Sequence, residues 1–119
     1  MSYLKDYSSG RTVLTVESDC IKDYSTGRTK YRISSDRVVD YSSGRTIYTF
    51  DNSSVRDYST GRTLLSVSGD QVRNYSTNRT IAYVDNTAIR DYSTGRTIYR
   101  IDGFLSGREK MALIAVLFG

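Results

Sequence analysis

Apolar and polar residues alternate in short runs along this chain, and the pattern returns in the same order every 17 residues. Runs such as Leu65-Ser66-Val67 and Tyr48-Thr49-Phe50 place an apolar residue at every second position, which is typical of strands with one buried face. The segment Asp6–Thr12 (Asp-Tyr-Ser-Ser-Gly-Arg-Thr) returns, with small changes, at Asp23, Asp40, Asp57, Asn74 and Asp91, without an insertion. The chain is therefore a six-copy tandem repeat.

Each copy predicts two strands and two turns. One strand ends in the Asp-Tyr pair, the next begins at Arg-Thr, and Ser-Thr-Gly or Ser-Ser-Gly lies between them. This composition predicts a three-residue hairpin loop whose last residue has a positive φ. The fifth copy carries Asn78 in place of Gly, and Asn is the residue that best tolerates positive φ after Gly. Two-residue turns are expected at Asp51-Asn52, Ser68-Gly69, Asp85-Asn86 and Asp102-Gly103.

Loops of three and two residues with two six-residue strands fill the 17-residue period. This register places Leu65 beside Val55 on one side and beside Val72 on the other. It aligns one apolar stripe across all strands: Leu14, Ile21, Tyr31, Val38, Tyr48, Val55, Leu65, Val72, Ala82, Ile89 and Tyr99. The same face carries Val16, Ile33, Phe50, Val67, Val84 and Ile101. We therefore predict an all-β fold, an antiparallel meander of about 12 short strands.

A parallel β-solenoid with one coil per repeat is the alternative fold. It would stack Arg on Arg and Asp on Asp at about 4.8 Å. Like charges in register are destabilising, which favours the meander.

The segment after the repeats changes period. Ser106 and Glu109 have the spacing of a capping box, and the following residues to Phe118 predict a short helix that is apolar nearly all round. The chain thus divides into a repeat domain, 1–105, and a helix, 106–119, that packs on the sheet. A helix about 18 Å long covers only part of a sheet roughly 55 Å wide. Because an insertion-free repeat shows no stagger for barrel closure, we expect a homo-oligomer through the apolar face or the helix.

Composition excludes most catalytic chemistry. The chain has no His and a single cysteine, Cys20, so neither a Ser-His or Cys-His pair nor a His metal site is available. We expect no enzyme, cofactor or metal site. Successive aspartates of the repeat lie two strands apart, about 9.6 Å, which is too far to share a calcium ion. The longest apolar run, Met111–Phe118, is shorter than the ~20 residues of a membrane helix. No signal peptide is visible, so the cytoplasm is the default expectation.

Arginine and tyrosine provide the candidate site. The outer face is expected to carry a row that alternates Tyr and Arg, beside a row that alternates Lys or Arg with Val, Ile or Leu. The first row comprises Tyr7, Arg11, Tyr24, Arg28, Tyr41, Arg45, Tyr58, Arg62, Tyr75, Arg79, Tyr92 and Arg96. Such a row can bind phosphates and stack bases, or bind acidic polysaccharide. Alternatively, Arg and Tyr stabilise each other through cation–π contacts.

The net charge of +4 permits an acidic partner without requiring one. The sequence therefore predicts first a non-catalytic β-repeat scaffold or protein-interaction module. A binder of nucleic acid or acidic polysaccharide, acting through the Arg/Tyr face, is the alternative.

The Tyr-Ser-x-Gly-Arg-Thr core resembles the YD repeats of RHS-type bacterial proteins, which carry Tyr-Asp-x-x-Gly-Arg and form long spiralling β-sheets. The resemblance covers five or six residues in each copy. Here Asp precedes Tyr and the spacing from Tyr to Gly is one residue shorter. The resemblance implies a bacterial type of β-hairpin array and no particular function.

Overall fold

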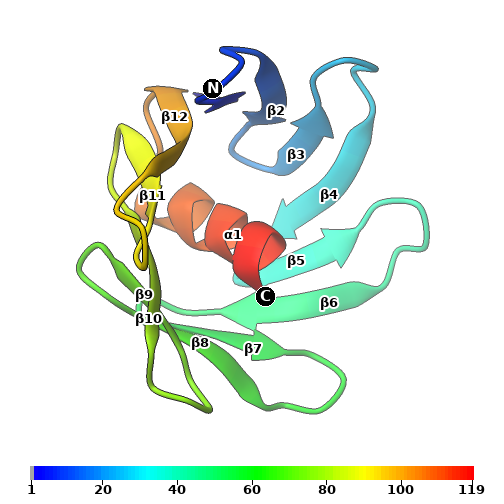
Figure 1. The fold of residues 1–119 in the computed structure, drawn as a ribbon. Coiled ribbons are helices and arrows are strands. Elements are labelled where there is room, and N and C mark those ends of the chain that lie inside the picture. The colour runs from blue at the N-terminus through cyan, green and yellow to red at the C-terminus, as the bar shows by residue number, and fades with distance from the viewer. Residues whose placement is uncertain (1) are drawn as a thin grey trace.

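The computed structural model describes residues 2–119 as a barrel of twelve strands with a helix inside it (Figure 1). The strands are β1 (Ser2–Asp6), β2 (Thr12–Val16), β3 (Cys20–Asp23), β4 (Thr29–Ser34), β5 (Arg37–Asp40), β6 (Thr46–Phe50), β7 (Ser54–Asp57), β8 (Thr63–Ser68), β9 (Gln71–Asn74), β10 (Thr80–Val84), β11 (Ala88–Asp91) and β12 (Thr97–Gly103). The helix α1 spans Gly107–Phe118.

Every strand pairs antiparallel with its neighbours in sequence, which confirms the meander and excludes the parallel solenoid. The first strand, β1, also pairs with the last strand, β12, so the sheet has no free edge. The structure therefore confirms the predicted fold class, but the sheet is a closed barrel and not the expected open sheet.

Closure depends on a stagger between repeats. Val55 on β7 is paired with Leu65 on β8, and Leu65 is paired with Asn74 on β9. A step across two strands therefore advances 19 residues along the chain. The same step joins Val72 to Asp91 by way of Ala82. Because the repeat is 17 residues long, the register advances by two residues in each copy. Over six copies the total stagger, in residues, equals the number of strands. The stagger and the strand number are also equal in (β/α)8 barrels, whose strands tilt by about 36°. The expectation that the repeat supplies no stagger was wrong.

The error lies in the short turns. The register Ser68↔Gln71 puts Gly69 and Asp70 at the tip of the β8–β9 turn, one residue later than expected. A later tip moves the pairing by two residues, so Leu65 lies opposite Asn74 and Val72 lies opposite Val67. The predicted Val55–Leu65 pair is confirmed, and the predicted Leu65–Val72 pair is wrong. A two-residue shift keeps every side chain on its predicted face, so the apolar stripe survives it.

The long loops contain four residues rather than three. Asp57 N donates to Arg62 O at 2.8 Å, and Gly61 N donates to Asp57 O at 2.9 Å. The tyrosine therefore belongs to the loop and not to the strand. The preceding strand has a β-bulge or register shift between Val55 and Arg56. The conformational prediction is confirmed: Gly10, Gly27, Gly44, Gly61 and Gly95 have φ values of 72–73°, and Asn78 has 61°.

The β1–β12 seam repeats the bonding inside the array. Tyr7 N donates to Ile98 O at 2.9 Å, as Tyr24 N donates to Val13 O at 3.1 Å. Strand β1 thus takes the place that the first strand of a seventh copy would have. Asp102-Gly103, expected as a hairpin turn, instead lies within β12, because the chain continues to the helix.

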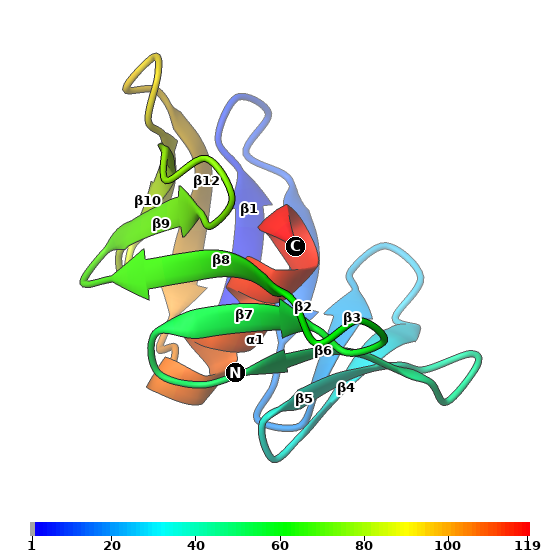
Figure 2. The ribbon, with the colours of Figure 1, turned by 90° about the horizontal axis from the view of Figure 1, so that it is seen from below.

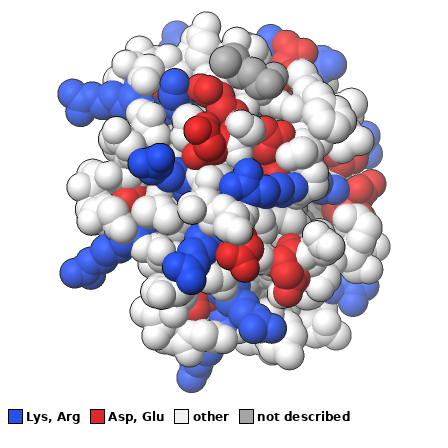
Figure 3. Space-filling view, turned by 180° about the vertical axis from the view of Figure 1, so that it is seen from behind, with Lys and Arg blue, Asp and Glu red and all other residues white. Residues whose placement is uncertain are grey.

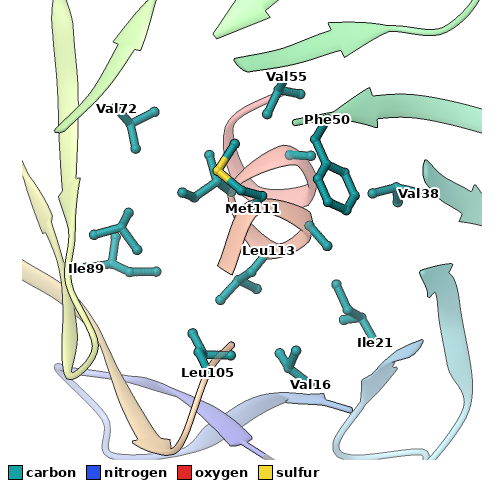
Figure 4. Packing of buried hydrophobic residues seen from close by; sticks show 14 of the residues in the cluster. Val16, Ile21, Val38, Phe50, Val55, Val72, Ile89, Leu105, Met111 and Leu113 are labelled. Carbon is teal, nitrogen blue, oxygen red and sulfur yellow. The ribbon is translucent and has the colours of Figure 1, made fainter. Parts of the chain in front are cut away.

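The ribbon shows α1 inside the ring of strands (Figure 2), and the predicted apolar stripe packs around it (Figure 4). Val38, Val55 and Val72 point inward from the wall and are fully buried. Met111 to Ala115 of the helix are buried among them, while Tyr31, Tyr48 and Tyr99 are partly buried and pack against this cluster. The helix, about 18 Å long, matches the shortest dimension of the molecule, 19 Å. None of the helices in residues 2–119 has the length and apolarity to cross a membrane.

Closure of the barrel removes the reason to expect a second copy on the apolar face. In a ring, the inner faces of all strands point toward one axis, so a single helix contacts strands that a flat sheet would hold far apart. The apolar stripe, which a second copy was expected to cover, is buried within one chain. A homo-oligomer stays a prediction, and it would have to use the outer surface.

The N-terminal end of the helix is held by side-chain hydrogen bonds. The capping box is confirmed: Glu109 N donates to Ser106 Oγ at 3.2 Å, and Ser106 N donates to Glu109 Oε1 at 2.8 Å. Arg108 donates to the carbonyl oxygens of Ser18, Ile33 and Ser35 at 2.7–3.0 Å. These carbonyls belong to β4 and to the short turns β2–β3 and β4–β5, so the first turn of the helix is attached to one end of the barrel.

Replacing Gly61 by Ala should lower the free energy of unfolding by about 1–2 kcal/mol, because an alanine at φ 72° is strained although its Cβ meets nothing within 4 Å. Gly61→Asn should cost less, as Asn78 indicates. Chemical denaturation measures both, and Gly107→Ala, at an ordinary φ, is the control. Equal stability of Gly61→Ala and wild type would contradict the strained-loop account.

Leu113→Ala should lower the free energy of unfolding by about 2–5 kcal/mol, because Leu113 is buried on all sides inside the barrel. Ile98→Ala, on the outer wall, should cost about 1 kcal/mol or less. The comparison uses thermal and urea unfolding of the two variants. Similar losses for the two would mean that the helix does not fill the barrel.

Candidate functional site

Six near-identical loops project at the rim of the ring, and we call them the Tyr/Arg loops (Figure 1). Each comprises the four residues of a long loop and the arginine that follows: residues 7–11, 24–28, 41–45, 58–62, 75–79 and 92–96. All twelve candidate residues predicted from the sequence lie in them: Tyr7, Tyr24, Tyr41, Tyr58, Tyr75, Tyr92, Arg11, Arg28, Arg45, Arg62, Arg79 and Arg96. The tyrosine is the first residue of each segment and the arginine is the last, so they do not form a row on the strands as expected.

The aspartate before each loop holds the loop in shape. Asp57 Oδ2 accepts from Thr60 Oγ1 at 2.7 Å, from Ser59 Oγ at 2.9 Å and from Thr60 N at 3.1 Å. Arg62 N in turn donates to Thr60 Oγ1 at 3.3 Å. Asp6, Asp23, Asp40 and Asp91 repeat this network. The loop therefore stabilises itself without the side chains of its tyrosine and arginine.

These hydrogen bonds set the electrostatics of the loop carboxylates. The hydroxyls of Thr60 and Ser59, followed by the Thr60 amide, lower the pKa of Asp57, and the equivalent donors lower the pKa of Asp6, Asp23, Asp40 and Asp91. Each of these carboxylates is negative at neutral pH and engaged within its own loop. In the fifth loop the neutral Asn74 takes this place, and its Oδ1 accepts from Ser76 Oγ at 2.8 Å.

The loop tyrosines lie against the outer wall and remain about half exposed, from 48% for Tyr58 to 60% for Tyr75. Tyr24 makes an edge-on contact with Tyr3 at 6.1 Å between ring centroids. Arg37, on β5, lies over the ring of Tyr58 at 5.5 Å from its centroid. The cation–π partner of Tyr58 is thus a wall arginine and not a loop arginine.

The loop arginines are all exposed. Within residues 2–119, the ion pairs join Lys5 to Asp102 at 3.2 Å, Lys22 to Glu17 at 3.0 Å, and Lys110 to Asp70 at 3.3 Å. Every cation in these pairs is a lysine. The loop arginines are therefore available to a partner.

Acidic and basic residues occupy different levels of the barrel. Apart from the aspartates directly before the Tyr/Arg loops, the acidic residues lie near the short-turn end or in the helix cap: Glu17, Asp19, Asp36, Asp51, Asp70, Asp85, Asp102 and Glu109. Apart from Asp102 on β12, which pairs with Lys5, the charges on the outer strand faces are basic: Lys5, Lys22, Lys30, Arg32, Arg37, Arg56, Arg73, Arg90 and Arg100. Both signs are visible on the face opposite to that of Figure 1, with several basic side chains projecting at its margin (Figure 3).

A second cluster lies on the outer wall near the β2–β3 turn, where ligand atoms of Glu17, Asp19 and Cys20 lie within 4.8 Å of one another. Lys22 already binds Glu17, and burial, together with the charge of Glu17, raises the pKa of the Cys20 thiol. The thiol is thus protonated at neutral pH, which disfavours metal binding.

The seam between β1 and β12 carries an open depression of about 600 Å³. Lys5, Asp6, Arg100 and Asp102 line it, and the Lys5–Asp102 ion pair lies within it. Its polar lining lacks the apolar walls of a typical small-molecule site.

A scan against protein-family models and searches of curated proteins and of solved structures found no match for this chain.

Replacing all five loop aspartates by Asn should reduce the acid sensitivity of the protein. Because the folded pKa values lie below the unfolded value of about 3.9, the stabilisation is complete above that pH and is lost as the pH falls below it. Thermal melts from pH 7 to pH 2.5 should show a smaller loss of Tm for the Asn variant than for wild type. At pH 7, Asp57→Ala should lower Tm more than Asp57→Asn. Parallel acid curves for wild type and the Asn variant would contradict this origin of acid sensitivity.

Proposed function

We propose that this protein is a non-catalytic interaction module that presents six copies of one loop on a rigid barrel. The observation that carries the proposal is the division of labour within each loop. The aspartate, the hydroxyls and the Gly or Asn form the loop, while the tyrosine and arginine stay exposed. Exposed side chains that recur without a part in the loop's own network are best explained by contact with a partner.

The interior supports a non-catalytic role. Apolar side chains fill the barrel, and Glu109 is the buried ionisable residue within the described range. Its carboxylate belongs to the helix cap. The sequence also lacks His, the usual general base at neutral pH.

A second candidate function is the binding of nucleic acid or acidic polysaccharide. It is favoured by six exposed arginines outside the ion pairs, each accompanied by an exposed tyrosine. Six weak contacts on one rigid frame add up through effective concentration, so a long polymer would bind far more tightly than a short one.

Replacing the six loop arginines by Gln should leave Tm within a few degrees of wild type and should abolish binding to heparin, used as the probe for an anionic polymer. Wild-type binding should weaken steeply with salt. A matched Arg→Lys variant keeps the charge and should retain part of the affinity.

The outcomes separate the hypotheses. An unfolded Gln variant would show that the arginines serve the barrel itself, against both functions. A folded wild type that ignores heparin at low salt would reject the anionic polymer and leave the protein-interaction module.

A further inference from the structure

The positive charge of the wall is unevenly distributed around the ring. Strands β7, β9 and β11 carry Arg56, Arg73 and Arg90 at equivalent outer positions, directly before the loop Asp or Asn. At the same positions, Lys5 on β1 and Lys22 on β3 are neutralised by ion pairs. Strand β5 carries the uncharged Val39 there.

The fifth Tyr/Arg loop increases this imbalance. It lies between β9 and β10 and follows Asn74, the one repeat position where the aspartate is replaced. Arg73 and Arg79 therefore lie on either side of a turn that has no carboxylate. Tyr75 of this loop, at 60%, is the most exposed of the loop tyrosines.

Aromatic and amide groups lie between the arginines on this part of the wall. Tyr83 on β10 pairs with Gln71 on β9 and with Arg90 on β11. The ring of Tyr92 lies 5.3 Å from that of Tyr83, and Arg73 donates to Gln71 Oε1 at 3.2 Å.

The charged groups around this region leave the arginines available. The buried Nε of Arg73 has no acceptor within residues 2–119. Asp91, next to Arg90 in the chain, accepts hydrogen bonds within its own loop. Asp85 Oδ1 already accepts from the amides of Thr87 and Ala88. We call the group of Gln71, Arg73, Tyr83, Arg90 and Tyr92 the β9–β11 patch.

We propose that the β9–β11 patch binds single-stranded nucleic acid, an inference that rests on the second candidate function. Tyr83 on β10 lies directly opposite Arg90 on β11 and, on its other side, opposite Gln71 on β9, two residues from Arg73. Arg73 and Arg90 are therefore two strands apart and offset along the strand, so their backbones are separated by more than about 9.6 Å. The two guanidinium groups contact backbone phosphates of the same strand, and a base stacks on the tyrosine pair beside them. The Gln71 amide can hydrogen-bond a base edge. A sulfated polysaccharide would use the cations alone, whereas a base also uses the aromatic pair.

The test measures the fluorescence anisotropy of a labelled single-stranded dT oligonucleotide of about 20 nucleotides. The Arg73→Gln, Arg90→Gln double variant should lower affinity at least tenfold and reduce the slope of log K against log salt by about 1.4, since each phosphate contact on a single strand contributes about 0.7. The control, Lys5→Gln with Lys22→Gln on β1 and β3, should change affinity by less than about twofold, because these lysines are already paired.

Tyr83 separates stacking from charge. Tyr83→Ala should weaken binding about 5- to 100-fold, while Tyr83→Phe, which keeps the ring, should bind nearly as wild type. Thermal melts check that each variant is folded, and Tyr83→Phe keeps the test valid if the Ala variant is not.

Three results would overturn the inference. If heparin binds and the oligonucleotide does not, the anionic-polymer function stands and the patch assignment fails. If the oligonucleotide binds but Tyr83→Ala and the control pair behave alike, or a duplex of the same length binds equally well, binding is charge alone and the assignment also fails. If neither polymer binds, both this inference and the second candidate function fail.

Discussion

The two-residue advance of register in each repeat is the constraint on which the rest of the structure depends. A sheet built without it would stay open and would expose one apolar face. With it, six copies return β12 to β1 at the bonding pattern that joins every other copy. Closure removes the free edges of the sheet, which would otherwise invite pairing with other chains. It also directs all inner faces toward one axis, and so creates the space that α1 fills.

Filling the interior with one apolar helix separates stability from display. The buried rows and the helix form a continuous core, and Arg108 and the capping box fix the helix to the short-turn end. At the rim, each Tyr/Arg loop is stabilised by its own aspartate and hydroxyls. Tyrosine and arginine are therefore left to the surface in all six copies. The carboxylates lie near the short turns, in the helix cap and directly before the Tyr/Arg loops, which keeps the outer strand faces predominantly basic although the whole chain has a charge of only +4.

Part of the candidate site could be predicted from the sequence. The twelve loop residues were identified by their spacing, because a strict repeat places like residues at like positions. Their setting was not, because the assignment of Tyr58 to a strand or a loop depends on a β-bulge that leaves no clear mark in the sequence. The β9–β11 patch was missed for a related reason. Gln71, Tyr83 and Arg90 are far apart in the repeat and meet only through the observed register.

The sequence by itself determined the local features of this protein. The 17-residue period and its alternation determined the strands, their antiparallel order and the face on which each residue lies. Turn chemistry determined the positive φ at Gly61 and Asn78, and the Ser106–Glu109 spacing determined the start of the helix. Only the tertiary structure decided that the sheet closes and that the helix lies inside it. The physical reason is that a two-residue shift in a turn leaves every side chain on the same face, so the hydrophobic pattern cannot detect it, yet summed over six copies this shift is the stagger that closes the barrel.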